Sequence, residues 1–409
     1  MATGAESVKA SGQGCVGAVR PSHFATVSLA LRLSFFYGGF FLSVGILSPF
    51  WPVWLTSRGL SPSEIGVLWA IGQWAKVAAT LVTGGIADRS GDPRRVMLVL
   101  AIVGVAGYAA CFGAHGFAAL ATLNALAVGS LAALLPVADS LATTATHRGH
   151  IDFGRVRMWG TIAFVVATLL GGHIVNGRAA DVILELVVAL VALNVVSCFL
   201  LPRGATHLGA DLVHSSAWRL MVTPQFLTFL ASTTLLAASH SVYYAFGSLH
   251  WQAQGFSDAA IAGFWAEGAA AEAVFFYCGA RAVRRYGPVP MMVVGAASGA
   301  VRWIVLALTG DWRLVVLVQL LHAGTIACAG LGAVHYLGRT IPAARMATVQ
   351  AINVAIVSGV GYGVVMPLSG VLYGAYGGRA YLAMAVLSAA SAVAAMMLKW
   401  PPAGAPTNS

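Results

Sequence analysis

Charged residues are scarce in this sequence. They make up 9% of its 409 residues, whereas hydrophobic residues make up 59% and the mean hydropathy is +0.82. A soluble domain carries about 25% charged residues, so this chain has too few of them to cover a surface that faces water. The composition instead indicates a membrane protein whose helices face lipid.

Patterns for binding nucleotides and metals are also missing. No Gly-Lys dipeptide occurs, so the chain has no phosphate-binding P-loop, and ATP hydrolysis by this chain is unsupported. The five cysteines are scattered without metal-ligand spacing, and the eleven histidines form no zinc-like cluster. Because no nucleophile lies in a pattern with a base either, we expect no metal, no cofactor and no enzymatic activity.

The apolar residues that are present fall into about twelve segments, each long enough to cross a bilayer as a helix. We therefore expect an all-α membrane protein with twelve transmembrane helices. The segments lie at approximately 26–55, 63–87, 95–114, 117–141, 156–175, 180–201, 222–248, 258–280, 288–308, 312–337, 346–374 and 378–399.

The basic residues are distributed unevenly between the two sides of these segments. Of the 23 Lys and Arg residues, three lie well inside predicted helices, away from their ends, and four lie in the loops of one side: Arg32, Lys76 and Arg302, and then Arg58, Arg178, Arg313 and Arg379. The other sixteen lie on the opposite side, together with both ends of the chain. Cytoplasmic loops carry such an excess, so we expect both termini in the cytoplasm and the protein in a bacterial inner membrane.

An internal repeat divides the chain into two halves. At an offset of 196 residues, the second predicted helix matches the eighth through the pairs Gly59/Gly255, Ser61/Ser257, Ile65/Ile261, Trp69/Trp265, Gly72/Gly268 and Arg89/Arg285. A repeat six helices apart predicts two pseudo-symmetric six-helix bundles. We expect an N-terminal tail at 1–22, bundles at 23–201 and 222–400, a cytoplasmic linker at 202–221 and a C-terminal tail at 401–409.

Lys76 and Glu272 occupy equivalent positions in the two halves and carry opposite charges. Each lies about 13 residues into its helix, near the bilayer midplane at about 1.5 Å per residue. A charge there costs about 2.5–3.5 kcal/mol, so each residue needs a partner or a water-filled cavity. Lys76 shares a polar stripe with Trp69 and Gln73, which favours a cavity. A structural ion pair is the alternative for both residues.

Further ionisable residues lie in the predicted helices of the second half. Glu267 and Glu272 are five residues apart, about 140° around a helix, so they cannot share one face. Glu272 lines up with Trp265 and is our preferred proton carrier, with Glu267 as a further candidate. His322 also lies within a predicted helix, where a lone histidine is more often hydrogen-bonded packing than a proton relay.

The loop after the second predicted helix reads GGIADRSGDPRR, from Gly84 to Arg95. It resembles the signature of the major facilitator superfamily, which has the pattern G-x-x-x-D-[RK]-x-G followed by basic residues. The resemblance implies a latch that holds one conformation, formed by Gly84, Asp88, Arg89, Gly91 and Arg95. The copy in the second half has Arg284 where the aspartate stands, so it keeps only half of this latch.

More specific stretches resemble the lactose permease and related sugar–proton symporters. PVAD (136–139) with DFGRVRMWGT (152–161) implies a pair between Asp139 and Arg157, and VRW (301–303) with QLLHAGT (319–325) carries over Arg302 and His322. The sequence departs from that family at Gln319 and Thr325, where the symporters have a lysine and a glutamate. The resemblance therefore does not supply their proton site.

Permeases of the phenylpropionate type are similar over nearly the whole chain, including the LH-x-G-T stretch and an acid that matches Glu272. This resemblance implies proton-coupled uptake of a small aromatic acid by a monomeric transporter. Lys76, Arg157 and Arg302 would attract its carboxylate, and Trp69, Trp265, Tyr243 and Tyr244 would contact its ring. The alternatives are proton-coupled sugar or nucleoside uptake, efflux by antiport, and a membrane sensor without transport.

Overall fold

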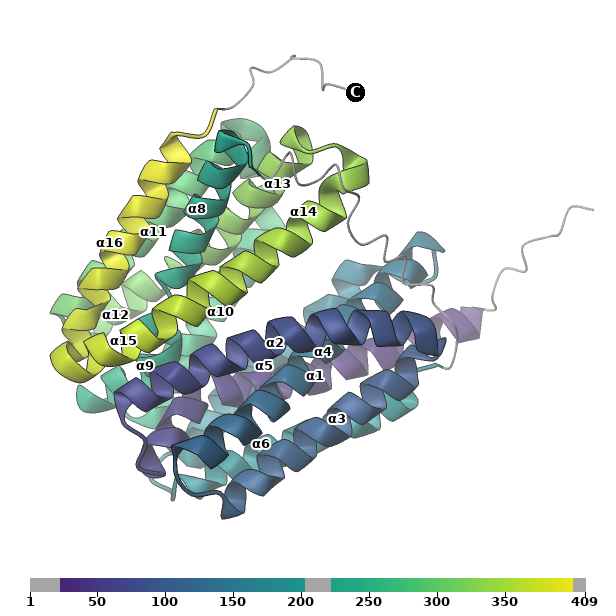
Figure 1. Cartoon of the computed structure of the whole chain (residues 1–409), viewed down its shortest axis with the longest axis horizontal. Coiled ribbons are helices and arrows are strands. Elements are labelled where there is room, and N and C mark those ends of the chain that lie inside the picture. Colours follow the sequence, from purple (N-terminus) through teal and green to yellow (C-terminus); the bar gives the residue numbers. More distant parts are fainter. Residues whose placement is uncertain (1–22, 203–221, 400–409) are drawn as a thin grey trace, which may run out of the picture.

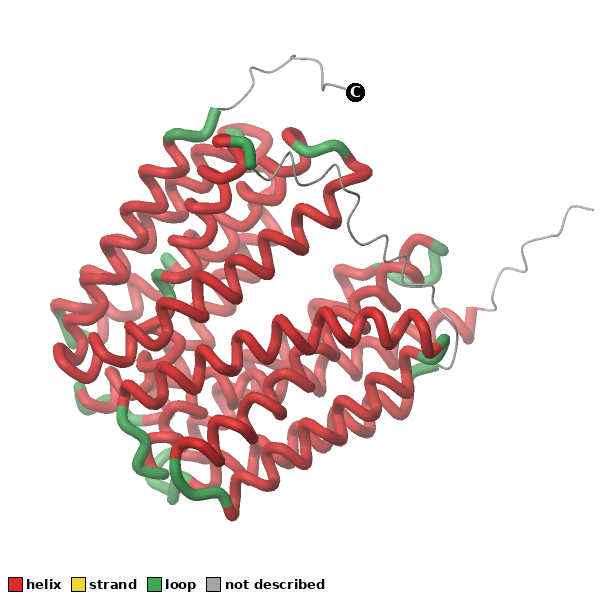
Figure 2. The backbone as a smooth tube through the Cα atoms, in the orientation of Figure 1, coloured by secondary structure: helices red, strands yellow, loops and turns green. Residues whose placement is uncertain are grey.

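The computed structural model of the chain describes residues 23–202 and 222–399. All regular structure within these two ranges is helical (Figures 1 and 2). The predicted tails and linker fall almost entirely outside the described residues. The first half contains α1 (His23–Ser57), α2 (Pro62–Ser90), α3 (Pro93–Ala110), η1 (Cys111–Gly113), α4 (Phe117–His147), α5 (Phe153–Val175) and α6 (Asp181–Leu200).

The second half forms a separate bundle beside the first (Figure 1). Several of its membrane-length segments are built from consecutive shorter helices. The helices of the second half are α8 (Pro224–Ala238), α9 (Ser241–Ala253), α10 (Asp258–Tyr286), α11 (Pro288–Leu308), α12 (Trp312–Gln319), η2 (Gly324–Cys328), α13 (Ala329–Thr340), α14 (Ala343–Ile356), η3 (Val357–Tyr362), α15 (Gly363–Tyr376), η4 (Gly377–Arg379) and α16 (Ala380–Met396).

The sequence repeat corresponds to a repeated way of starting a helix. Ser61 and Ser257 cap α2 and α10, and each side-chain oxygen accepts a hydrogen bond from the backbone N–H three residues later. Two residues before each cap, Gly59 and Gly255 have φ angles of 83° and 87°. Only glycine adopts such angles without strain, so both halves use one turn to enter the helix that carries Lys76 or Glu272.

Three predicted helices of the second half are interrupted. The segment expected at 222–248 breaks between α8 and α9, where Ser239 Oγ donates a hydrogen bond to Leu236 O and His240 Nδ1 contacts the same carbonyl oxygen. These side chains replace the backbone bonds that the break removes. The segments at 312–337 and 346–374 each contain a π-helical turn, η2 and η3. Such turns are frequent at functional sites.

Ten helical segments of the described residues are long and apolar enough to span a bilayer. The pair α8 and α9 falls outside this set because each helix is shorter than a span, and α14 to α16 are joined in one segment, Val349–Met396. These two features account for the difference from the twelve segments that hydropathy predicts. The count of twelve and the sidedness therefore stay predictions.

The two bundles meet at one end and diverge at the other (Figure 2). The contact lies where α2 begins and α15 ends, and where α5 ends and α10 begins. A Cβ atom at Gly66 would lie 2.5 Å from Met366 O, and one at Gly172 would overlap the Cβ of Ala262. At the other end the ribbons of the two halves separate, so the described helices of the two bundles pack against each other at one end.

Reporter fusions test the predicted orientation. Fusions after Arg95, Arg203 and Lys399 should all report the cytoplasm, because the sixteen-to-four excess of basic residues lies on that side. The activities of alkaline phosphatase and green fluorescent protein fusions give the measurement. A periplasmic signal at any of the three positions would overturn the orientation.

Candidate functional site

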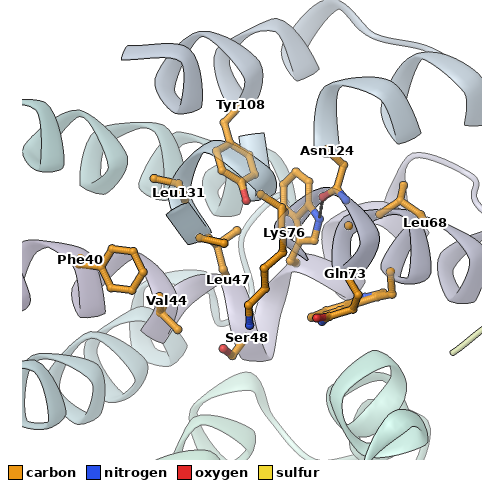
Figure 3. A pocket seen from close by; sticks show the side chains of 15 residues that line it. Phe40, Val44, Leu47, Ser48, Leu68, Gln73, Lys76, Tyr108, Asn124 and Leu131 are labelled. Atoms are coloured by element: carbon orange, nitrogen blue, oxygen red, sulfur yellow. Dashed lines mark hydrogen bonds between the residues drawn. The ribbon is translucent and has the colours of Figure 1, made fainter. Parts of the chain in front are cut away.

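A pocket of about 250 Å³ lies inside the first bundle (Figure 3). Four helices contribute to it, and most of its lining is apolar or aromatic. Its lining residues are Phe40, Val44, Leu47, Ser48 and Trp51 of α1, Leu68, Trp69, Gly72, Gln73 and Lys76 of α2, Tyr108 of α3, and Asn124, Val128, Leu131 and Ala132 of α4. Small-molecule sites are typically apolar hollows with a few placed polar groups.

The polar stripe predicted on the second helix faces this pocket. Trp69, Gln73 and Lys76 are spaced four and three residues apart on α2, so they share one helix face, and all three line the pocket. The pocket belongs to one half only, and Trp265, the symmetry partner of Trp69, lies in the other bundle. This pocket therefore contains predicted cavity residues of the first half alone.

Lys76 is the only charged residue in the pocket lining, and its side chain is exposed. None of the ion pairs formed by the described side chains includes it. Lys76 therefore does not form a structural ion pair with any of the described side chains. A cation without an acidic partner, over an apolar lining, can bind an anionic group of a ligand.

Asp139 and Arg157 form the ion pair that the family resemblance implies. Arg157 Nε lies 3.9 Å from Asp139 Oδ1, and both side chains are about one-third exposed. Tyr37 Oη donates a 2.6 Å hydrogen bond to the same carboxylate oxygen, and the guanidinium lies 4.4 Å from the ring centre of Phe41. The pair connects α1, α4 and α5 and does not line the pocket.

A second polar cluster lies in the other half and centres on Arg302, which is fully buried. Its Nε and Nη2 donate hydrogen bonds of 3.2 and 2.7 Å to Gln319 Oε1, and Nη1 lies 3.0 Å from His322 Nδ1. Its guanidinium also lies 4.2 Å from the ring centre of Tyr243. Neutral side chains thus provide the hydrogen bonds that the buried guanidinium of Arg302 would otherwise make to water.

Glu272 joins this cluster through His322. Glu272 Oε2 lies 3.4 Å from His322 Nε2. Because a guanidinium can only donate, His322 Nδ1 must accept from Arg302, so the proton of the neutral imidazole sits on Nε2, the nitrogen that contacts Glu272. Arg302, His322 and Glu272 thus lie in a row, in which a hydrogen bond joins the buried cation to the imidazole and a 3.4 Å contact joins the imidazole to the carboxylate.

Most of the aromatic residues predicted to contact the ring of a substrate lie in or beside this second cluster. Tyr243 is 1% exposed, and its hydroxyl accepts a hydrogen bond from Gln319 Nε2. Its ring centre lies 4.5 Å from that of Trp265, whose indole N–H donates to Ser248. Tyr244 is half-buried and lies between Trp265 and Tyr362. Only Trp69 of the four predicted aromatic residues lines the pocket.

The remaining predicted residues lie apart from both clusters. Glu267 is half-buried on α10, and the described side chains give it no hydrogen bond or ion pair. In the predicted latch, Gly91 ends α2 with a φ angle of 63°, and Arg95 pairs with Asp92 at 3.1 Å. The side chain of Asp88 lies outside the described side chains, so the latch stays a prediction.

Several residues of these clusters escape prediction from the sequence. Tyr37, Tyr108 and Asn124 lie in apolar segments without any motif, and a single Asn within a predicted membrane span is the one signal that points to a site. Gln319 stands out only as a departure from the sugar symporters, whereas the structure makes it the main partner of Arg302. His240 connects the α8–α9 break to η2 through a 3.1 Å contact with Thr325 Oγ1.

The chain resembles known transporters along most of its length. It is 32% identical over 364 residues to a protein of Escherichia coli (strain K12) named "Probable 3-phenylpropionic acid transporter", which covers 86% of this chain and 93% of that protein. It is 24% identical over 335 residues to the maltose permease of Geobacillus stearothermophilus, over 80% of this chain and 83% of that one.

Solved structures share the fold. The crystal structure of the nucleoside transporter NupG superposes with a TM-score of 0.79 at 18% identity, over 90% of this chain and 98% of that one. A bacterial homolog of the human lysosomal transporter Spinster superposes with a TM-score of 0.75 at 15% identity, over 94% and 100%. Residues 30–383 match the model of the MFS_1 like family. The chain therefore belongs to the MFS_1 like family of the major facilitator superfamily, and it is a multi-pass membrane transporter and not an enzyme.

Proposed function

We propose that the chain takes up a small aromatic monocarboxylic acid together with protons, by alternating access across the bacterial inner membrane. The observation that carries this proposal is Lys76, an exposed cation in an otherwise uncharged pocket. Its ammonium group would bind the carboxylate by a charge-assisted hydrogen bond. The other lining residues would then contact the rest of the substrate.

The pocket lining favours an aromatic or similarly apolar body. Phe40, Leu47 and Trp69 are three of its many apolar or aromatic side chains, and its volume of about 250 Å³ suits a small molecule. A sugar would instead need a hydrogen-bond partner for nearly every hydroxyl. The similarity to the probable 3-phenylpropionic acid transporter supports the same substrate class.

Proton coupling would use the second cluster. Glu272 can exchange a proton with solvent-accessible space because it is only partly buried, and it contacts the buried Arg302 through His322. A proton on Glu272 removes the negative charge that faces this cation, so protonation and the packing of α10, α11 and η2 are linked. Asp139, paired with Arg157, is the second candidate for the proton site.

Uptake into proteoliposomes tests the proposal. Labelled 3-phenylpropionate should accumulate against its concentration gradient when the lumen is more alkaline than the outside, and accumulation should stop when an uncoupler removes the pH gradient. Unlabelled aromatic acids should compete with it. Uptake that saturates but ignores the pH gradient would overturn proton coupling and leave the substrate class in place.

A nucleoside or sugar is the second candidate substrate. The Asp139–Arg157 pair resembles that of the sugar symporters, and the relatives include a maltose permease. Uridine and maltose in the same assay decide between the classes, since saturable uptake of either one without competition by aromatic acids would replace the first candidate. Release of the acid from loaded vesicles against its gradient would instead indicate efflux by antiport.

Lys76→Met should weaken binding of the acid by about 10- to 150-fold, which corresponds to the loss of one charge-assisted hydrogen bond of about 1.5–3 kcal/mol. Methionine keeps most of the length of the side chain and removes only the charge. Titration calorimetry with 3-phenylpropionate measures the effect. The control ligand is 3-phenylpropionamide, whose affinity should be nearly the same for both proteins. An equal loss for acid and amide would mean that Lys76 shapes the pocket without binding the carboxylate.

A further inference from the structure

The polar groups of the pocket differ in depth. At the rim, Lys76 is exposed and Gln73 is half-buried. At the inner end, Tyr108 of α3 is 0% exposed and Asn124 of α4 is 2% exposed. The pocket therefore has a charged rim, an apolar middle and a neutral, polar inner end.

Both inner groups have hydrogen-bonding capacity that the protein does not use. The hydroxyl of Tyr108 is buried and has no hydrogen-bond partner among the described residues. The Oδ1 atom of Asn124 accepts a 3.0 Å bond from Trp51 Nε1, which directs its NH₂ group to the other side, against Gly72 of the pocket lining. Buried polar groups are nearly always paired in native proteins, so an unpaired hydroxyl at the end of a pocket is available to a polar group of a ligand.

The two ends of the pocket are separated along the side chain of Lys76. In Figure 3 the Tyr108 hydroxyl points into the pocket beside the start of this chain, while the ammonium group lies at its other end, near Ser48. A carboxylate held at the ammonium group thus leaves the ring of the acid between the rim and Tyr108.

We propose that Tyr108, assisted by Asn124, binds an oxygen substituent on the ring of the substrate, so that the transporter prefers ring-hydroxylated aromatic acids. This inference rests on the proposed function. A phenolic hydroxyl can donate to or accept from Tyr108 and accept from the Asn124 amide. A substituent of the same size without hydrogen-bonding capacity leaves these buried groups unpaired, and sites of this kind reject such analogues strongly.

Matched ligand pairs test the preference. Titration calorimetry on the purified protein compares 3-(4-hydroxyphenyl)propionate with 3-(4-methylphenyl)propionate, and the corresponding pair substituted at ring position 3. The hydroxylated acid of at least one pair should bind about tenfold more tightly than its methyl analogue, the effect of one hydrogen bond. Tyr108→Phe should reduce this ratio to about twofold or less without changing the affinity for the methyl acid.

Tyr381→Phe is the matched control variant. Its hydroxyl is likewise buried without a partner, but it lies in the other bundle and does not line the pocket. It should keep the tenfold ratio. An unchanged ratio in Tyr108→Phe would overturn the inference, and so would equal affinities of the wild-type protein for both members of each pair, a result that needs no variant to fold.

The assay also separates this inference from the proposed function. If 3-phenylpropionate binds and neither hydroxylated acid is preferred, the inference fails and the proposed function stands. If no aromatic acid binds at any concentration that the assay covers, both fail together.

Discussion

Glu272→Gln should abolish accumulation of substrate driven by a pH gradient and preserve exchange of substrate across the membrane. Glutamine keeps the size of the side chain and can still contact His322 Nε2, which lies 3.4 Å from the carboxylate. It cannot bind or release a proton at neutral pH. Since exchange involves no net proton movement, only the coupled mode is lost.

The measurement compares two modes of transport in the same proteoliposomes. With an imposed pH gradient, the internal substrate concentration should reach only the external one, whereas counterflow should proceed at close to the wild-type rate. Glu267→Gln is the control, because Glu267 lies on the same helix without a partner among the described side chains. Normal accumulation by Glu272→Gln would refute the assignment and direct attention to Asp139.

Local patterns allowed the main features to be predicted. The repeat at an offset of 196 residues identified two helices that begin with the same capped turn, because Ser61 and Ser257 both accept backbone hydrogen bonds. The spacing of Trp69, Gln73 and Lys76 identified the face of α2 that lines the pocket. These are features of one helix at a time, which periodicity and capping rules describe.

Contacts between distant helices could not be predicted in the same way. Tyr37 and Asp139 are 102 residues apart, and Gln319 contacts Tyr243 over 76 residues, so no local pattern records either bond. The break at His240 was also not predicted, because hydropathy does not record that a side chain contacts the backbone carbonyl four residues earlier. The inner end of the pocket, with Tyr108 and Asn124, depends on how α3 and α4 pack, which a single sequence does not specify.

Gly66→Leu and Gly172→Leu should each abolish transport by forcing apart the end at which the two bundles meet. The crossings are related by the internal repeat, since Ala262 is the equivalent of Gly66 at the same offset of 196 residues. A Cβ at Gly66 would lie 2.5 Å from Met366 O and 3.1 Å from Gly370 Cα, and one at Gly172 would overlap Ala262. Backbone atoms cannot move aside as a flexible side chain can.

The size of the effect follows from the clash. Overpacking a well-packed contact costs about 1–3 kcal/mol, and occasionally more. A shift of about 3 kcal/mol already brings a 99:1 equilibrium close to equal populations, since about 1.4 kcal/mol is a factor of ten. Either variant should therefore populate the opposite conformation. Spin labels at positions 148 and 284, two exposed sites at the diverging end, should show shorter distances in a cysteine-free background.

Gly263→Leu provides the control for this clash. Gly263 is adjacent to Ala262 on α10, but a Cβ there would meet nothing within 4 Å. This variant should keep both the transport rate and the wild-type distance distribution, because the new side chain enters open space. If it shifted the distances as far as Gly172→Leu does, the bulk of leucine in α10 and α5 would be the cause, and the close approach of Gly172 to Ala262 would not control which end is open.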